Sequence, residues 1–138
     1  SDWESTYPNI VRIKRLVNAS YFAWLFPRAN KGGGEGPYSY DAFLRAAARY
    51  PHFCDDAAYG VQSSYLLDKD TVCRIELSTL FAHIVQETGE HTPSRPEPTW
   101  RQGLYWFKEV ACDVANPSAA CSYAQTSGWA ADAWPPRT

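Results

Sequence analysis

The sequence contains no methionine, not even at position 1, and no long hydrophobic run. A chain without its initiator methionine is expected to be either processed or written without its start, and removal of a signal peptide is the simplest reason. No apolar run approaches the roughly 20 residues that a membrane-spanning helix needs. These two absences predict a secreted, extracellular protein without a membrane span.

The chain also lacks an excess of basic residues, since its 13 Lys+Arg stand against 15 Asp+Glu and leave a net charge of -2. A nucleic-acid-binding domain carries a broad basic surface, so this class of function is not expected. Aromatic residues, in contrast, make up 15% of the sequence and include six Trp and nine Tyr. Such a content suits a surface that stacks on sugar rings, but an ordinary aromatic core explains it about as well.

Zinc-binding spacings are absent as well, because the sequence has no CxxC and no His pair at ligand spacing. We therefore expect no metal and no cofactor. Four cysteines in a secreted chain fit two disulfides, for which three connectivities are possible. We favour Cys54–Cys73 and Cys112–Cys121, because each pair closes a short local loop. Asn18 begins the sequon Asn-Ala-Ser, which is a glycosylation site in a eukaryotic secretory route.

Hydrophobic periodicity and capping residues predict a mainly helical chain. Asn9 can cap a helix over residues 10–17, and Ser39 can cap a second helix over residues 40–50. A long helix is expected to begin at Asp70 or Thr71 and to stop before Gly89. The other segments are expected to be an apolar segment over residues 21–26, a flexible Gly-rich loop over 30–37, at most one short helix over 55–70, a Pro-rich loop over 92–99, and either a strand or a helix over 100–112.

A carboxylate lies on the apolar stripe of the long helix. Glu87 is three residues past Ile84 and seven past Leu80, so it shares their face. At the C-terminal end of a helix the partial negative charge of the backbone disfavours a second negative charge. Partial desolvation on the core face also disfavours the charged form. Both effects are expected to raise the pKa of Glu87, which suits a general acid. The alternative is a frayed helix end at which Glu87 reaches water.

Glu109 follows Glu87 by 22 positions, after a proline-rich loop and an aromatic run. Two glutamates that face each other across a cleft lined by Trp and Tyr form the pattern of glycoside hydrolysis. Spacing alone does not select this pair, because the sequence also offers Glu76, Glu90 and Glu97.

Several stretches resemble family 19 glycoside hydrolases, the chitinases with a lysozyme-like helical fold. The resemblance runs from about Ala19 to Cys121 and includes the cysteine pair 112/121. It rests on "ASYFAWLFPRAN", "YSYDAFLRAAARYPHFC", "CRIELSTLFAHIVQETGEH" and "GLYWFKE". The third stretch is similar to the helix that ends in the family's His-Glu-Thr-Gly type motif, and the fourth to the segment that closes with its catalytic base.

The resemblance implies an inverting hydrolase of chitin, the β-1,4-linked polymer of N-acetylglucosamine. It makes Glu87 the general acid and Glu109 the general base that activates water. The substrate-binding residues that we expect are Gln86, Thr88, Trp100, Tyr105 and Trp106. In a strand, Tyr105 and Trp106 would point to opposite faces, so that one of them would line the cleft.

The chain departs from the family in two ways. Gln86 stands where many members have His, and Glu90 stands where they have a second Gly. The Tyr-Gly-Arg-Gly and Asn-Tyr-Asn-Tyr segments that usually follow are not in the sequence, so residues 1–138 are expected to be a single, partial domain.

Three explanations of the partial domain stay open: a fragment, a cleaved chain whose remainder is a second partner chain, or a lineage that lost this half. The missing segments lead to one alternative, a non-catalytic chitinase-like protein that binds a carbohydrate or a protein. A further alternative is a peptidoglycan hydrolase of the same lysozyme-like architecture, because the length of the chain is near that of small lysozymes.

Overall fold

The computed structural model describes residues 2–56, 58–59 and 66–108. The chain divides into two compact units, Ser1–Phe107 and Lys108–Thr138, and the elements below belong to the first. Glu109, Cys112 and Cys121 lie outside the described residues, so their predicted roles stay predictions. The single partial domain over 1–138 likewise stays a prediction.

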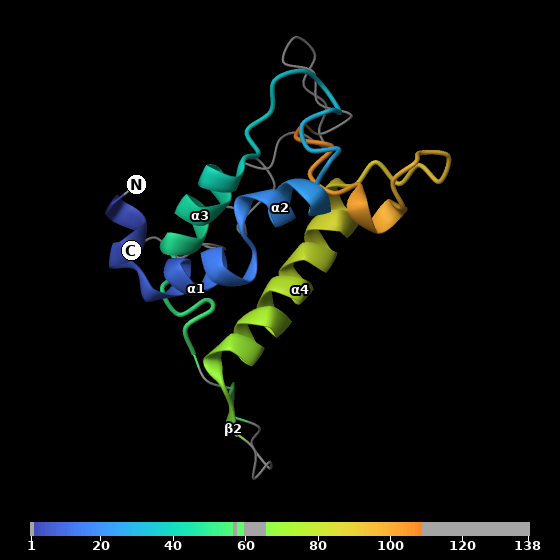
Figure 1. Cartoon of the computed structure of the whole chain (residues 1–138). Coiled ribbons are helices and arrows are strands. Elements are labelled where there is room, and N and C mark those ends of the chain that lie inside the picture. Colours follow the sequence, from blue (N-terminus) through green and yellow to red (C-terminus); the bar gives the residue numbers. More distant parts are fainter. Residues whose placement is uncertain (1, 57, 60–65, 109–138) are drawn as a thin grey trace, which may run out of the picture. The chain divides into compact units, whose positions relative to one another are not determined.

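The described part of the chain is mainly helical, which confirms the predicted class (Figure 1). Two strands of two residues each pair in an antiparallel manner, with Ala58 opposite Leu67 and Tyr59 opposite Leu66. The expectation of at most a short helix over residues 55–70 is therefore wrong at these strands. The elements, in chain order, are η1 (Asp2–Thr6), α1 (Pro8–Leu16), α2 (Ala19–Leu25), α3 (Tyr40–Ala48), β1 (Ala58–Tyr59), β2 (Leu66–Leu67), α4 (Lys69–Thr88) and η2 (Thr99–Arg101).

Side-chain caps fix the start of three helices. Ser39 caps α3 as predicted, since its hydroxyl accepts a hydrogen bond from the backbone N–H of Ala42 at 3.0 Å. Asn18 caps α2 in the same way through the N–H of Tyr21 at 2.8 Å. The cap of α4 is Asp68, which accepts from the N–H of Thr71 at 2.7 Å, so this helix begins earlier than predicted.

Asn9 does not cap α1, contrary to the prediction. The N-cap is Tyr7, whose side chain makes no capping hydrogen bond, and Pro8 occupies the first helical position. The Asn9 side chain is buried instead and donates to the carbonyl oxygens of Ala47 at 3.1 Å and Tyr50 at 3.2 Å. A residue type that suits a cap is used here to bind α1 to the end of α3.

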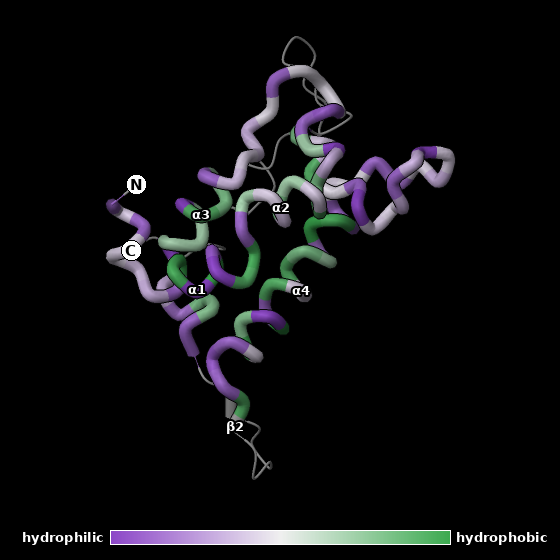
Figure 2. Tube along the Cα trace, in the orientation of Figure 1, coloured by the Kyte–Doolittle hydropathy of each residue, from purple (hydrophilic) through white to green (hydrophobic). Residues whose placement is uncertain are grey.

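The hydrophobic core lies where α1 contacts both α3 and α4 and where α2 contacts α3. Hydrophobic residues recur along the whole of α4 (Figure 2). No helix in the described ranges has the length and apolar composition needed to cross a bilayer. The fully or nearly buried apolar side chains are Ile10, Ile13, Val17, Phe22, Phe26, Leu44, Ala47, Cys54, Val72, Cys73, Leu77 and Leu104.

Covalent and ionic links attach the start of α4 to the preceding chain. A disulfide joins Cys54 to Cys73 with a Cα–Cα distance of 4.2 Å, which confirms this predicted pair. The carboxylate of Asp70 accepts from Arg15 at 2.7 and 2.8 Å and from Arg12 at 3.0 Å, both on α1. The orientation of α4 is therefore set at its first turn.

Candidate functional site

Glu87 lies in the last turn of α4, which ends at Thr88. Gly89 terminates the helix as predicted, and its backbone N–H still bonds the carbonyl oxygen of Val85 at 3.0 Å. A Cβ atom at position 89 would lie 2.4 Å from that same oxygen. Only glycine fits this position without a local shift, so the chain turns away immediately after the carboxylate.

The Glu87 side chain is exposed, so the expected partial burial of this carboxylate is wrong. The apolar stripe runs from Leu77, which is buried, through Phe81 and Ile84, which are half-buried, to a surface position. The core lies under the first part of α4 and the stripe leaves it toward the C-terminal end. Within the described part of the chain the Glu87 carboxylate forms no hydrogen bond or ion pair, which leaves it available to a ligand.

The segment 104–106 docks on the residue next to Glu87. The Thr88 hydroxyl accepts from the N–H of Leu104 at 2.7 Å. The Thr88 carbonyl oxygen accepts from the N–H of Tyr105 at 3.1 Å and from that of Trp106 at 2.9 Å. The structure thus brings together the two sequence motifs that predicted the site.

Leu104 adopts a strained backbone conformation within this segment. Its φ of 58° lies in the left-handed region, which is unfavourable for a branched side chain. The residue is held there because its side chain is buried, its N–H bonds Thr88, and its carbonyl oxygen accepts from the N–H of Asn30 at 2.8 Å. Such strain costs about 1–3 kcal/mol and persists only where the surroundings impose it.

The Gly-rich loop packs against the other side of the same segment. The N–H of Gly32 donates to the carbonyl oxygen of Tyr105 at 3.0 Å. Asn30 exchanges two hydrogen bonds with the backbone of Tyr38, and the Tyr38 hydroxyl donates to the carbonyl oxygen of Trp106 at 3.3 Å. The loop that the sequence suggested to be flexible is thus anchored at residues 30, 32 and 38.

A second carboxylate near the helix end is fully engaged. Glu90, whose side chain is 6% exposed, accepts from Arg28 at 2.9 Å and from Arg95 at 2.8 Å. The hydrogen bond from Arg95, and then that from Arg28, lower the pKa of Glu90. The Arg28 guanidinium also lies 5.3 Å from the centre of the Tyr105 ring. Glu90 therefore stays charged and holds Arg28 and Arg95 in place beside the site.

Gln102 holds the loop that connects the two motifs. Its side chain is fully buried, and its amide oxygen accepts from the N–H of Thr92 at 2.8 Å. Its amide nitrogen donates to the carbonyl oxygens of Thr92 at 2.9 Å and Glu97 at 2.8 Å. This one side chain bonds both Thr92 and Glu97 and so fixes the loop just before Gly103 and Leu104, the residues that lead to Thr88 on α4.

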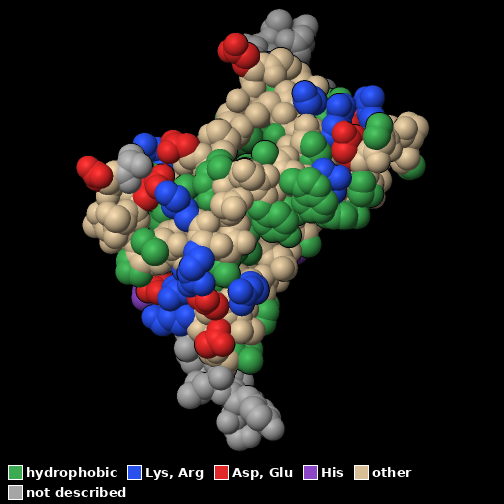
Figure 3. Space-filling view, in the orientation of Figure 1, with side chains coloured by type: hydrophobic (Ala, Val, Ile, Leu, Met, Phe, Trp, Pro, Cys, Tyr) green, Lys and Arg blue, Asp and Glu red, His purple; other side chains and the backbone are tan. Residues whose placement is uncertain are grey.

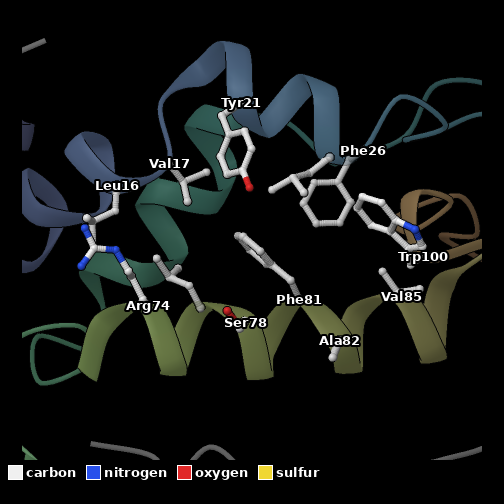
Figure 4. Close-up of a pocket in the computed structure, with 12 residues that line it drawn as sticks. Leu16, Val17, Tyr21, Phe26, Arg74, Ser78, Phe81, Ala82, Val85 and Trp100 are labelled. Atoms are coloured by element: carbon white, nitrogen blue, oxygen red, sulfur yellow. The ribbon is translucent and has the colours of Figure 1, made fainter. Parts of the chain in front are cut away.

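The predicted sugar-contacting aromatic residues fall into two groups. Tyr105 and Trp106 adjoin Thr88, and their rings contact each other edge to face at 4.8 Å, so they do not point to opposite faces as they would in a strand. Trp100 lies in η2, is 55% exposed and packs against Trp24, 5.7 Å between ring centres. It lines a groove along α4 instead of joining the other two (Figure 4).

The remaining predicted residues with described positions are on the surface. Gln86 is exposed, and its backbone carbonyl oxygen lies 2.9 Å from Nε2 of His91. Asn18 is exposed and uses its amide oxygen to cap α2. Sequence reasoning missed Arg28, Gln102 and Gly32, because their roles depend on contacts between distant segments; the one available signal was that Glu90 departs from the family motif.

Comparison of the chain with protein-family models, with curated proteins and with solved structures finds no match.

Proposed function

We propose that the protein is a family 19 chitinase-like glycoside hydrolase that acts on β-1,4-linked N-acetylglucosamine polymers by an inverting mechanism. Glu87 is the general acid, which protonates the leaving oxygen of the glycosidic bond. Glu109 is the general base, which deprotonates a water on the opposite face of the sugar.

The observation that carries the proposal is the docking of segment 104–106 on Thr88. The sequence motif of the acid and the segment that leads to the base meet there through three hydrogen bonds, two to the carbonyl oxygen of Thr88 and one to its hydroxyl. Glu109 follows Trp106 by three residues, and three residues span at most about 11 Å. Inverting enzymes place their two carboxyl groups about 6.5–9.5 Å apart, which is the separation that the proposal expects of Glu87 and Glu109.

The contrast between Glu87 and Glu90 supports the choice of acid. Two arginines hold the charged form of Glu90, and a carboxyl group with a lowered pKa is a poor proton donor near neutral pH. Glu87 is exposed and carries no such ion pair among the described residues. Trp106, whose backbone N–H bonds the carbonyl oxygen of Thr88, is 38% exposed, and its ring offers an apolar face for stacking on a sugar.

Hydrolysis of the hexasaccharide of N-acetylglucosamine by the 138-residue chain tests the proposal. Proton NMR of the first products reports the anomer, and inversion predicts α-anomers from β-linked substrate. Glu87→Gln should lower the turnover rate at least about a hundredfold, the usual contribution of a general acid. Glu97→Gln is the matched control, because this side chain makes no ion pair or hydrogen bond among the described residues.

The same experiment separates the alternatives. Binding of the hexasaccharide without any turnover, both by this chain and by the chain extended with its genomic continuation, would favour the non-catalytic chitinase-like protein. Release of products from peptidoglycan but not from the hexasaccharide would favour a peptidoglycan hydrolase. Turnover that Glu87→Gln leaves unchanged would refute the role of this glutamate.

A further inference from the structure

An apolar groove of about 610 Å³ runs beside α4 (Figure 4). One wall is a stripe of α4 whose members are three and four residues apart, and which consists of Arg74, Leu77, Ser78, Phe81, Ala82 and Val85. The stripe runs over twelve residues, 74–85, or about 16 Å of helix, which is about three turns. The groove therefore follows α4 for about three helical turns.

The opposite wall comes from α1, α2 and the residues that follow each of them. Val17 and Phe26 line it and are also part of the buried core, as is Leu77 on α4. Trp100 closes one end of the groove (Figure 4). The groove is thus continuous with the packed interior and exposes an edge of the core.

The apolar surface of α4 is larger than its contacts within the described residues cover. Val72, Cys73 and Leu77 are buried, but Ile75 is 52% exposed, and Phe81 and Val85 are only half-buried. Of these, Phe81 and Val85 line the groove, so its α4 wall keeps apolar surface in contact with solvent. On the face shown in Figure 3, hydrophobic side chains also gather over α2, η2 and the neighbouring end of α4.

A single cation marks the other end of the groove. Arg74 makes no hydrogen bond or ion pair with any described residue, whereas Arg12 and Arg15 are held by Asp70. Arg74 lies at the end opposite Trp100 (Figure 4). An occupant with an apolar body and an anionic group at one end therefore complements this groove, although Asp68, the N-cap of the same helix, already interacts electrostatically with Arg74.

We propose that this groove is the docking site of an amphipathic helix from a partner polypeptide. The helix inserts apolar side chains, three and four residues apart, between α4 and α2, and an acidic side chain at one end of that row pairs with Arg74. Helical spacing on the receiving wall favours this occupant, because the ridges of one helix pack into the grooves of another. Continuity with the core supplies the apolar contact that such packing requires.

The test uses a labelled synthetic peptide of about fifteen residues that forms a helix, with leucines at three- and four-residue spacing and one glutamate a turn beyond them. Its binding to the 138-residue chain is followed by fluorescence anisotropy. Arg74→Glu should weaken binding at least tenfold, and exchanging the peptide glutamate for lysine should restore it. Ala82→Trp fills the groove and should abolish binding.

Two matched variants keep these results specific. Arg49→Glu reverses an exposed arginine outside the groove, and Ala46→Trp adds the same bulk to an exposed position of α3. Both should bind the peptide as the unchanged chain does, and circular dichroism should show the same helix content throughout.

Three results would overturn the proposal. The first is equal binding of a peptide with the same composition but scrambled leucines. The second is unchanged binding to the Ala82→Trp variant. The third is a self-associated chain that Ala82→Trp converts to a monomer in sedimentation, because a second copy would then occupy the groove.

Discussion

The hydroxyl of Thr88 accepts a hydrogen bond from the backbone N–H of Leu104 at 2.7 Å and itself donates to the carbonyl oxygen of Ile84 at 2.5 Å. One side chain thereby joins the last turn of α4 to a segment sixteen residues further along the chain. Because Leu104 is buried and in the left-handed region, its N–H has no easy alternative partner.

We therefore expect Thr88→Val, which keeps the shape but removes the hydroxyl, to lower the free energy of unfolding by about 1–3 kcal/mol. Thr88→Ser should recover most of this loss. Thr79→Val is the control, because the exposed Thr79 hydroxyl donates only within its own helix, to Ile75. Urea denaturation measures all three, and equal effects at positions 88 and 79 would show that the tertiary bond contributes nothing.

Two neighbouring glycines should respond very differently to alanine. A Cβ atom at position 32 would lie 2.5 Å from the carbonyl oxygen of Tyr105, whereas one at position 33 would lie 3.5 Å from the Phe107 ring. Gly32→Ala should destabilise the protein by about 1–3 kcal/mol, and Gly33→Ala should change its stability by less than about 0.5 kcal/mol. Thermal unfolding checks this order, which a reversed ranking would contradict.

Removal of the Cys54–Cys73 disulfide should lower the free energy of unfolding by about 3 kcal/mol. The bridge spans 19 residues, and a loop of this size restricts the unfolded chain by about that amount. The double variant Cys54→Ala with Cys73→Ala is compared with the unchanged chain by guanidinium denaturation. A loss below about 1 kcal/mol would mean that the ion pairs of Asp70 hold the start of α4 without the bridge.

The ion pairs of Asp70 should make stability depend on pH in the acid range. Hydrogen bonds from Arg15, and then from Arg12, lower the pKa of Asp70 from 3.8 to about 2. A lowered pKa in the folded state adds stability above the unfolded value, and this contribution is lost as the pH falls from about 4 through about 2.

Asp70→Asn should therefore melt at a lower temperature than the unchanged chain at pH 7, and at nearly the same temperature below about pH 2. Asp41→Asn is the control, because Asp41 pairs with Arg45 on the surface, where both side chains are 60% exposed and the pair adds little. A difference for Asp70→Asn that stays constant down to pH 1.5 or so would contradict the assignment.

Local signals in the sequence were sufficient for the helices. Ser39 before Tyr40 and Gly89 after Thr88 set helix ends that the structure confirms, because caps and stops act over a few residues. Asn9 shows the limit of this reasoning. Its amide nitrogen donates to the carbonyl oxygens of Ala47 and Tyr50, which are 38 and 41 residues away, and no local pattern reports such contacts.

The candidate site was predictable to the same degree. The motif around Glu87 and the segment at Tyr105 were found from residue order, and the structure places them side by side at Thr88. The supports of the site were not found, because the burial of Gln102 and the ion pairs of Glu90 exist only once the loop between them has closed. The periodicity of α4 also failed to show that its apolar stripe reaches the surface at Glu87.

The disulfide lies near the start of α4 and the Glu87 carboxylate near its end, so a small tilt of the helix at the disulfide becomes a larger displacement at the carboxylate. Cys73 and Glu87 are fourteen residues apart, which corresponds to about 21 Å along the axis. With the helix pivoting near its bridge at Cys73, a tilt of only about 3° displaces the far end by about 1 Å. If Glu87 is the general acid that we propose, an error of that size can cost about a hundredfold in rate. Substitutions of Arg12, Arg15 or Asp70 should thus shift the position of the Glu87 carboxylate, although none of these residues contacts it.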